Sequence, residues 1–233
     1  MIKMNKIVLA ITLLVAFSTV GYSQTENTAK QEAIQRAKAK YSRSIQYNDF
    51  AIAKDAIYDL LVLEPSNFSY LDSLAYMYFE FRQYASAALV SRDALNRNPQ
   101  NRMMLQIGAK SLSELGAIDQ SLKMYEKLYT ISDDAFVLFE IAQKQYDLKK
   151  YDEAMINTEL LLGKPIVEGS QVYVNNASGE QIEAPFKAVV HNLQGLIARA
   201  QGNEESAKKY FNNALKLAPN YALAKENLNP KKE

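Results

Sequence analysis

Small and bulky apolar residues alternate along the chain at the spacing of closely packed helix pairs. The stretch 193–221 (LQGLIARAQGNEESAKKYFNNALKLAPNY) predicts two short helices, joined by a turn at Gly202-Asn203 and ended by Pro219. Small residues let two helix axes approach, and bulky neighbours fill the groove beside them. The alternating residues in this stretch are Gly195, Ala207, Ala214, Tyr210, Phe211 and Leu215. A single pair cannot bury its apolar face, so the pattern predicts further pairs.

A small residue follows each predicted turn at a regular interval. These anchor residues are Ala53, Ala87, Ser121, Ala154 and Ala207, at intervals of 34, 34, 33 and 53 residues. The pattern resembles the tetratricopeptide repeat, a helix–turn–helix unit of about 34 residues. The resemblance implies an all-α, right-handed solenoid domain over residues 24–233, with five repeats and a C-terminal capping helix. The expected repeats cover 30–66, 67–100, 101–132, 133–165 and 185–219, and the capping helix covers 220–229.

Polar residues and glycines predict where the helices begin and end. Ser132 is the expected N-cap of the fourth repeat, because a serine side chain accepts a hydrogen bond from the first helical turn. Asp133 and Asp134 would then lie near the positive end of the helix dipole, which stabilises a carboxylate. Turns within repeats are expected at Asn48-Asp49, Gly116 and Gly202-Asn203.

The last interval between anchor residues indicates an insert. It is 53 residues long, which is 19 more than 34, and the extra residues are expected over 166–184. Gln171-Val-Tyr-Val174 and Gln181-Ile-Glu183 alternate as strands do, around a run rich in Asn, Ser and Gly. This arrangement predicts a β-hairpin. Pro185 is then expected in the first turn of the next helix, where its missing N–H costs nothing.

An isolated hairpin is marginally stable in water, so this one is expected to pack on neighbouring helices. Tyr173 or Ile182 would cover apolar surface of the fourth and fifth repeats. The free edge strand would then be available to pair with a strand of a partner. A mobile loop without packing is the alternative interpretation of the same residues.

The first 23 residues resemble a secretory signal peptide. Lys3 and Lys6 precede an apolar run over 7–17, and Gly21 and Ser23 supply small residues before a cleavage point at Gln24. The run is too short for a stable span of a bilayer about 30 Å thick. The expectation is an exported protein of a bacterial periplasm or cell envelope, or a secreted one, that does not span the membrane after cleavage.

Little in the composition supports catalysis or cofactor binding. The chain has no Cys and a single histidine, His191, so a zinc site with three or four N or S ligands is not expected. No phosphate-binding glycine loop or nucleophile motif is present, so no catalytic residue, metal or cofactor is assigned. His191 is expected to pack within its helix pair. The formal net charge of +1, without basic clusters, argues against a nucleic-acid partner.

The resemblance implies a concave groove lined by the first helix of each repeat. In one subclass, polar residues of this groove clamp a C-terminal carboxylate. Lys38 fits that pattern, but Ser42, Ser73, Met103 and Ile107 replace the other clamp residues, which argues against a clamp here. The residues expected on the groove are Lys38, Asp72, Tyr76, Phe79, Met103, Gln106, Lys110, Phe136, Phe139, Gln143, Tyr146, Asn192 and Arg199.

The aromatic residues of the groove suggest anchors for a partner. Rings that gather in a concavity bordered by charged residues are typical of protein interfaces. Packing of the same rings between adjacent helices is the other interpretation, and one ring can do both. The sequence therefore predicts a non-catalytic adaptor that binds a protein or peptide, of undetermined oligomeric state. The alternatives are a structural subunit of an envelope assembly, a holder of unfolded clients and, least favoured, an accessory to an enzyme.

Overall fold

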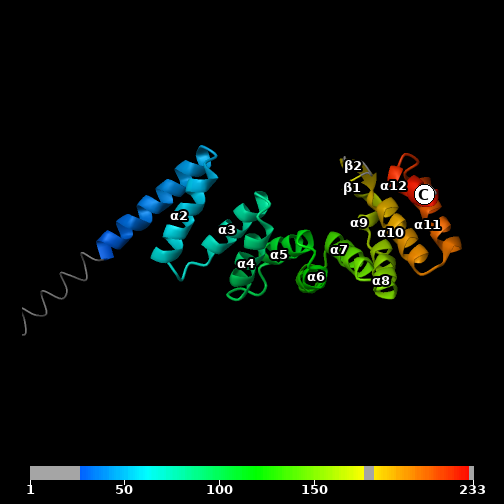
Figure 1. The fold of residues 1–233 in the computed structure, drawn as a ribbon, viewed down its shortest axis with the longest axis horizontal. Coiled ribbons are helices and arrows are strands. Elements are labelled where there is room, and N and C mark those ends of the chain that lie inside the picture. The colour runs from blue at the N-terminus through cyan, green and yellow to red at the C-terminus, as the bar shows by residue number, and fades with distance from the viewer. Residues whose placement is uncertain (1–26, 176–180, 231–233) are drawn as a thin grey trace, which may run out of the picture. The chain divides into compact units, whose positions relative to one another are not determined.

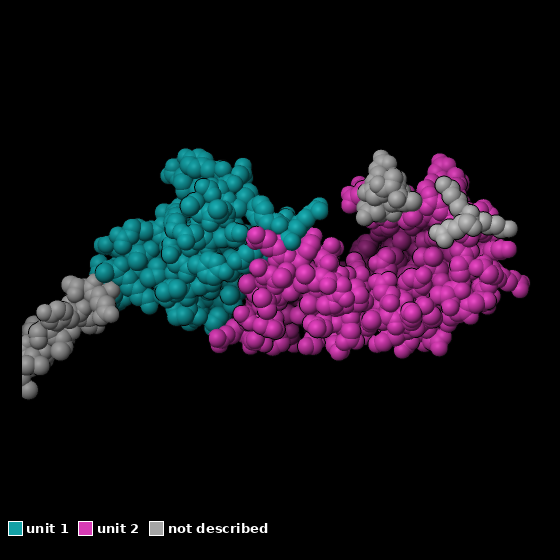
Figure 2. Space-filling view, in the orientation of Figure 1, with its two compact units in different colours: residues 1–82 teal, residues 83–233 magenta. Residues whose placement is uncertain are grey.

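The chain is described in a computed structural model over residues 27–175 and 181–230. The predicted signal peptide at 1–23 and the tip of the predicted hairpin lie outside these residues. The chain divides after Arg82 into two compact units, whose described residues are 27–82 in the first and 83–175 and 181–230 in the second (Figure 2). The boundary after Arg82 divides the predicted second repeat between its two helices.

The first unit consists of helices around a small apolar core. Ile34 and Ala37, from the helical residues 27–46, pack against Leu60. The chain turns at Asn48, which has a φ of 56°, and the side chain of Asp49 accepts a hydrogen bond from Ile52 N at 3.2 Å. The turn predicted at Asn48-Asp49 is confirmed. Two further helices follow, α2 (Phe50–Leu63) and α3 (Ser69–Glu80) (Figure 1).

The second unit contains helix pairs in chain order, interrupted by one hairpin (Figure 1). Glycines with positive φ end the first helix of two pairs, Gly116 at 75° and Gly202 at 81°. Glycine takes this conformation without the steric cost that a Cβ imposes. The helices are α4 (Tyr84–Leu95), α5 (Arg102–Glu114), α6 (Ile118–Ser132), α7 (Ala135–Asp147), α8 (Tyr151–Leu162), α9 (Ile166–Gly169), α10 (Phe186–Ala200), α11 (Glu204–Leu217) and α12 (Ala222–Leu228).

The cap predicted at Ser132 is wrong by two residues. Ser132 is the last residue of α6, and its hydroxyl donates back to Leu128 O at 2.8 Å. Asp133 adopts a left-handed conformation, with φ of 48°, and separates the two helices. The N-cap of α7 is Asp134, whose carboxylate accepts a hydrogen bond from Phe136 N at 2.7 Å. Ser and Asp are equally good N-cap residues, so the local sequence does not distinguish Ser132 from Asp134. The left-handed conformation of Asp133 ends α6 and makes Asp134 the N-cap of α7.

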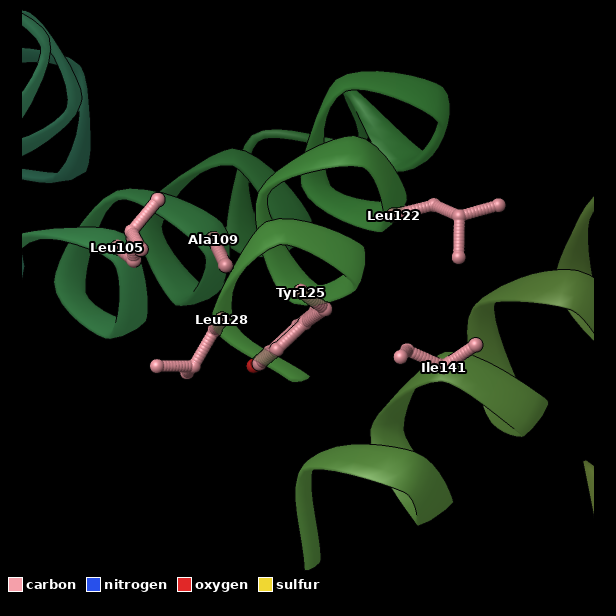
Figure 3. Close-up of a cluster of buried hydrophobic side chains, with 6 residues drawn as sticks. All are labelled: Leu105, Ala109, Leu122, Tyr125, Leu128 and Ile141. Carbon is pink, nitrogen blue, oxygen red and sulfur yellow. The ribbon is translucent and has the colours of Figure 1, made fainter. Parts of the chain in front are cut away.

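The anchor residues are fully buried on the second helix of each pair. Ala53, Ala87, Ser121, Ala154 and Ala207 are all 0% exposed. The hydroxyl of Ser121 remains satisfied because it donates to Ala109 O at 2.8 Å. A cluster from α5, α6 and α7 fills the space beside this contact, with Tyr125 as its largest residue (Figure 3). The regular spacing in the sequence therefore reflects repeated close packing.

The insert folds as a one-turn helix, α9, and a hairpin of β1 (Gln171–Asn175) and β2 (Gln181–Pro185). The one-turn helix was not predicted from the sequence. Val172 pairs with Ala184 and Val174 with Ile182, so these side chains share one face of the hairpin. That face packs on the cluster formed by α10, α11 and α12.

Of the two residues expected to cover the helices, one is confirmed, and the expected start of the next helix needs correction. Tyr173 is on the other face of β1 and is 72% exposed, so Ile182, and not Tyr173, covers the helices. Pro185 ends β2 and is the N-cap of α10, with ψ of 130°, so the helix begins one residue later than predicted. Its extended backbone allows one residue to serve both elements.

Candidate functional site

A pocket of about 440 Å³ opens on the second unit beside the hairpin. Its walls come from α7, β1, α10 and the start of α12, which lie far apart in the sequence. The first helices of two successive pairs, α7 and α10, form its floor. Pockets of this size and mostly apolar lining are typical of ligand and peptide sites. We call it the aromatic pocket.

Three phenylalanine rings define the floor of the aromatic pocket. Phe186 is fully buried, and the Phe136 ring stacks on it with centroids 5.0 Å apart and an interplanar angle of 13°. Phe139 meets Phe186 edge-on, at 5.4 Å and 84°. Phe136 is nevertheless 40% exposed, so its ring packs on one side and is open to solvent on another. A ring held in this way is preorganised for a partner, because little side-chain entropy remains to be lost.

Three polar side chains line the aromatic pocket, and they come from the same two helices. Glu140 and Gln143 follow Phe136 on α7 at helical spacing, which places all three on one face. Asn192 on α10 is 7% exposed, and its Oδ1 accepts a hydrogen bond from Asn227 Nδ2 at 2.9 Å. The pocket therefore combines apolar area with a carboxylate and two amides.

Burial raises the pKa of two tyrosine hydroxyls in the second unit. Tyr221 lines the pocket at the start of α12 and is 3% exposed, and burial raises its pKa to about 12. Tyr125 on α6 is also buried, and burial together with the nearby Glu140 carboxylate raises its pKa. The negative charge of Glu140 thus acts on the Tyr125 hydroxyl of the neighbouring helix α6.

The hairpin forms one wall of the aromatic pocket. Val172 and Val174 line it from the packed face, and exposed Tyr173 stands at its rim. Glu183 is opposite Tyr173 on β2 and is also exposed. Among the residues that the structure describes, β1 pairs with β2 alone. The insert therefore adds a wall to a floor that the helices alone would leave open.

Part of the groove predicted from the sequence lies at this pocket. The structure brings Phe136, Phe139, Gln143 and Asn192 together, with Tyr173 of the insert beside them. Met103, Gln106 and Lys110 are exposed on α5 in the same unit but do not line the pocket. The predicted groove residues of the first unit are Lys38, Asp72, Tyr76 and Phe79.

Other predicted groove residues have partners within their own unit. Arg199 donates to Glu204 at 2.7 Å and to Asn227 O at 2.6 Å, so it ties helices together. The Tyr146 ring packs on Tyr151, with centroids 5.9 Å apart, and is half-buried. In the first unit, Lys38 forms an ion pair with Glu64 at 3.1 Å.

Several lining residues were not indicated by the sequence. Glu140 shares a helix face with Phe136 and Gln143, and this i, i+4, i+7 spacing was a signal that could have found it. Phe186 lines the pocket from the start of α10, whereas Tyr221 and Leu223 reach it only because α12 folds back on α10. The periodicity of residues within a single helix or strand does not predict where the chain folds back on an earlier helix.

The described residues offer little for other chemistry. Within 27–175 and 181–230, no three residues of the types His, Cys, Asp and Glu are grouped so as to hold a metal ion. No helix in that part of the chain is long and apolar enough to cross a membrane. His191 is half-buried and its Nδ1 lies 2.9 Å from Gln194 Oε1, which agrees with the predicted packing role.

Comparison with known proteins agrees with this architecture. Residues 188–221 match the model of the tetratricopeptide repeat, a range that spans most of α10, all of α11 and the turn between them. No curated protein sequence matches the chain. Three solved structures of similar fold illustrate the likeness, and their identities of 13–16% concern the fold alone.

The first is a crystal structure of MamA protein, with 13% identity and a TM-score of 0.65 over 87% of this chain and 98% of that one. A tetratricopeptide repeat protein from Parabacteroides merdae has 16% identity and a TM-score of 0.66, over 84% of this chain and 71% of its own. YrrB, described as having an unusual peptide-binding site, has 16% identity and a TM-score of 0.66 over 85% and 96%. The predicted fold, a helical repeat solenoid with a hairpin insert, is confirmed.

Proposed function

We propose that this chain, a tetratricopeptide-repeat protein by its fold and by the sequence of residues 188–221, is a non-catalytic scaffold that binds a segment of a partner protein in the aromatic pocket. The observation that carries the proposal is the Phe136 ring, which is packed on buried Phe186 and still open to solvent. Exposed rings held rigidly in a concavity are the usual anchors of protein interfaces. One solved structure of the same fold is described as having a peptide-binding site, which supports this class of ligand.

The cellular location of the protein is part of the same proposal. The Lys-flanked apolar run and the small residues before Gln24 favour export, so the partner would be a protein of the periplasm, the cell envelope or the outside medium. N-terminal sequencing of the protein recovered from producing cells tests this step. Material that begins at Gln24 agrees with it, and material that retains residues 1–23 contradicts it.

Photo-crosslinking in producing cells tests the binding proposal. A photoreactive residue replaces Gln143 in the aromatic pocket, and in a second strain it replaces Gln106, which is exposed on α5 outside the pocket. One stoichiometric adduct from position 143, absent from position 106, is the expected result. Many substoichiometric adducts from position 143 would instead indicate a holder of unfolded clients. Equal adducts from both positions would contradict a site at the pocket.

A role as a structural subunit has an observation of its own. A hollow of about 560 Å³ lies between α6 and α8, on the second helices of two pairs. Ile156 and Leu160 line it and are 57% and 56% exposed, so apolar area is open there as well. A third photoreactive position at Glu159, which lines this hollow, separates the two functions. A strong adduct at position 159 with none at 143 would favour the subunit.

A further inference from the structure

The aromatic pocket has one charged residue among the fourteen that line it, and that residue is Glu140. The remaining lining is aromatic, aliphatic or uncharged polar. Among the residues that the structure describes, no Lys or Arg lines the pocket. An occupant of the pocket therefore meets a single negative charge in largely apolar surroundings, where charges interact more strongly than in water.

Within the part of the chain that the structure describes, Glu140 forms no ion pair. The basic residue one turn further along α7, Lys144, is directed to Asp147 instead, with Nζ and Oδ2 3.8 Å apart. The Glu140 carboxylate interacts with the Tyr125 hydroxyl, which is uncharged. The carboxylate thus lies at a binding surface without a cation to neutralise it.

The open ring of Phe136 and the carboxylate of Glu140 are neighbours on α7. They are four residues apart, so both side chains lie on one face of the helix, with Gln143 one turn further on. A cation gains when it lies over an aromatic face and when it meets a carboxylate. A planar guanidinium can do both, since it stacks on a ring and donates parallel hydrogen bonds to two oxygens.

Resting on the proposed function, we propose that the aromatic pocket selects a partner segment by an arginine side chain, which stacks on Phe136 and pairs with Glu140. Lysine, a strongly hydrated point charge, binds more weakly there. An apolar side chain would cover the carboxylate and leave it desolvated without a partner. An acidic side chain would face a like charge. The remaining apolar lining, including Val172 and Leu223, contacts the residues of the segment that flank the arginine.

Selection of displayed peptides on the purified protein tests the inference without knowledge of the natural partner. The probe is a phage library of random nonapeptides, selected against the unmodified protein. Arginine should be enriched at one fixed position beside apolar residues. The affinity of the best peptide should fall about tenfold or more for Glu140→Gln, since a hydrogen bond to a charged group has that size. Replacement of the arginine by lysine should have a smaller effect, and replacement by glutamate should abolish binding.

Glu153→Gln is the matched control, because it makes the same change at an exposed glutamate on α8 that lines neither the aromatic pocket nor the hollow between α6 and α8. It should leave peptide affinity unchanged. Glutamine at position 140 can still accept a hydrogen bond from Tyr125, so both variants should retain the helical circular dichroism of the parent. The gain-of-function variant Gln143→Glu should tighten binding of the arginine peptide severalfold.

The outcomes separate this inference from the proposed function. Peptides with apolar or acidic anchors, whose affinity depends on Phe136 and not on Glu140, would overturn the arginine assignment and leave the binding pocket standing. Peptides indifferent to Phe136→Ala, or a failure to select any peptide, would overturn both. Equal losses for Glu140→Gln and Glu153→Gln would show a general charge effect and also overturn the assignment.

Discussion

The side chain of Asn227 donates a hydrogen bond to the side chain of Asn192, with Nδ2 and Oδ1 2.9 Å apart. Asn192 lines the aromatic pocket from α10, and Asn227 lies on the capping helix α12. The main-chain oxygen of Asn227 also accepts from Arg199 at 2.6 Å. The capping helix is thus joined by polar contacts to the helix that forms the floor of the pocket, and its start supplies Tyr221 to the lining.

The first prediction concerns this bond. Asn192→Ala should destabilise the protein by about 1–2 kcal/mol, because it leaves the partly buried amide of Asn227 without its acceptor. Hydrogen exchange should rise in α12 more than in α5 or α6. Urea unfolding and exchange mass spectrometry measure both effects. Asn212→Ala is the control, at an exposed position on α11, and should change stability by less than about 0.5 kcal/mol. Equal exchange in α12 of both variants would show that the bond does not hold the helix.

The second prediction concerns the close contacts between helices. Ala87→Leu and Ala154→Leu should each cost about 1–3 kcal/mol, because both alanines are fully buried and the added methyl groups overpack the contact. The urea midpoint measures the loss. Ala85→Leu on the exposed side of α4 makes the same change without a packed neighbour and should be nearly neutral. If Ala87→Leu were as mild as Ala85→Leu, the anchor positions would not be the closest contacts.

These anchor residues also show what the sequence could predict. Close packing of two helices requires a small side chain at each contact. Small residues therefore recur at regular intervals along the sequence, and this recurrence reveals the repeat. The N-cap of α7 was harder to predict, because the side chains of Ser132 and Asp134 are both suited to accept a hydrogen bond from the first helical turn. The left-handed backbone of Asp133 depends on how α6 and α7 pack. Its carboxylate pairs with Lys164, at 2.7 Å, across the repeat.

The aromatic pocket was predictable in part for a related reason. Phe136, Phe139 and Gln143 lie on one helix, and the periodicity of that helix places them on a common face. Tyr221 and Val172 reach the same space through chain reversals at the hairpin and before α12. The alternation within β1 indicated a strand but did not indicate which of its faces would pack. Burial of Val172 against the helices decided that choice, and it left Tyr173 at the rim.

The third prediction concerns alkaline pH. Burial raises the pKa of Tyr221 to about 12, above the value of about 10 for an exposed tyrosine. Above pH 10 the unfolded chain loses this proton while the folded chain keeps it, so the folded state binds more protons and stability falls as pH rises to about 12. Tyr221→Phe should make this fall shallower, by up to about 2–3 kcal/mol at pH 12.

Urea unfolding at pH 8, 10, 11 and 12 measures this effect. Tyr173→Phe removes a hydroxyl from an exposed side chain and is the control, with an unchanged pH profile. Tyr125 is also buried, and burial raises its pKa. Part of the loss of stability at alkaline pH should therefore remain in both variants. Parallel profiles for Tyr221→Phe and the parent would show that Tyr221 ionises without unfolding.

The last prediction separates the two roles of the hairpin. Replacing residues 171–183 by a short Gly/Ser linker removes Val172, Val174 and Ile182 from the apolar cluster of α10 and α12. Since these three side chains are partly buried, the fifth helix pair should lose a few kcal/mol of stability while the circular dichroism stays helical. Affinity for a peptide selected on the aromatic pocket should fall at least about tenfold, because one wall of the pocket is lost.

Tyr173→Ala serves as the comparison, since it alters the rim and leaves the packed face of β1 in place. If affinity falls for the linker variant alone, the hairpin acts by closing the pocket. If it falls equally for Tyr173→Ala, the exposed face of β1 contacts the ligand, in agreement with an edge strand open to a partner. If neither variant changes affinity, the rings of α7 and α10 suffice, and the hairpin serves to cover the apolar surface of α10 that the repeats leave open.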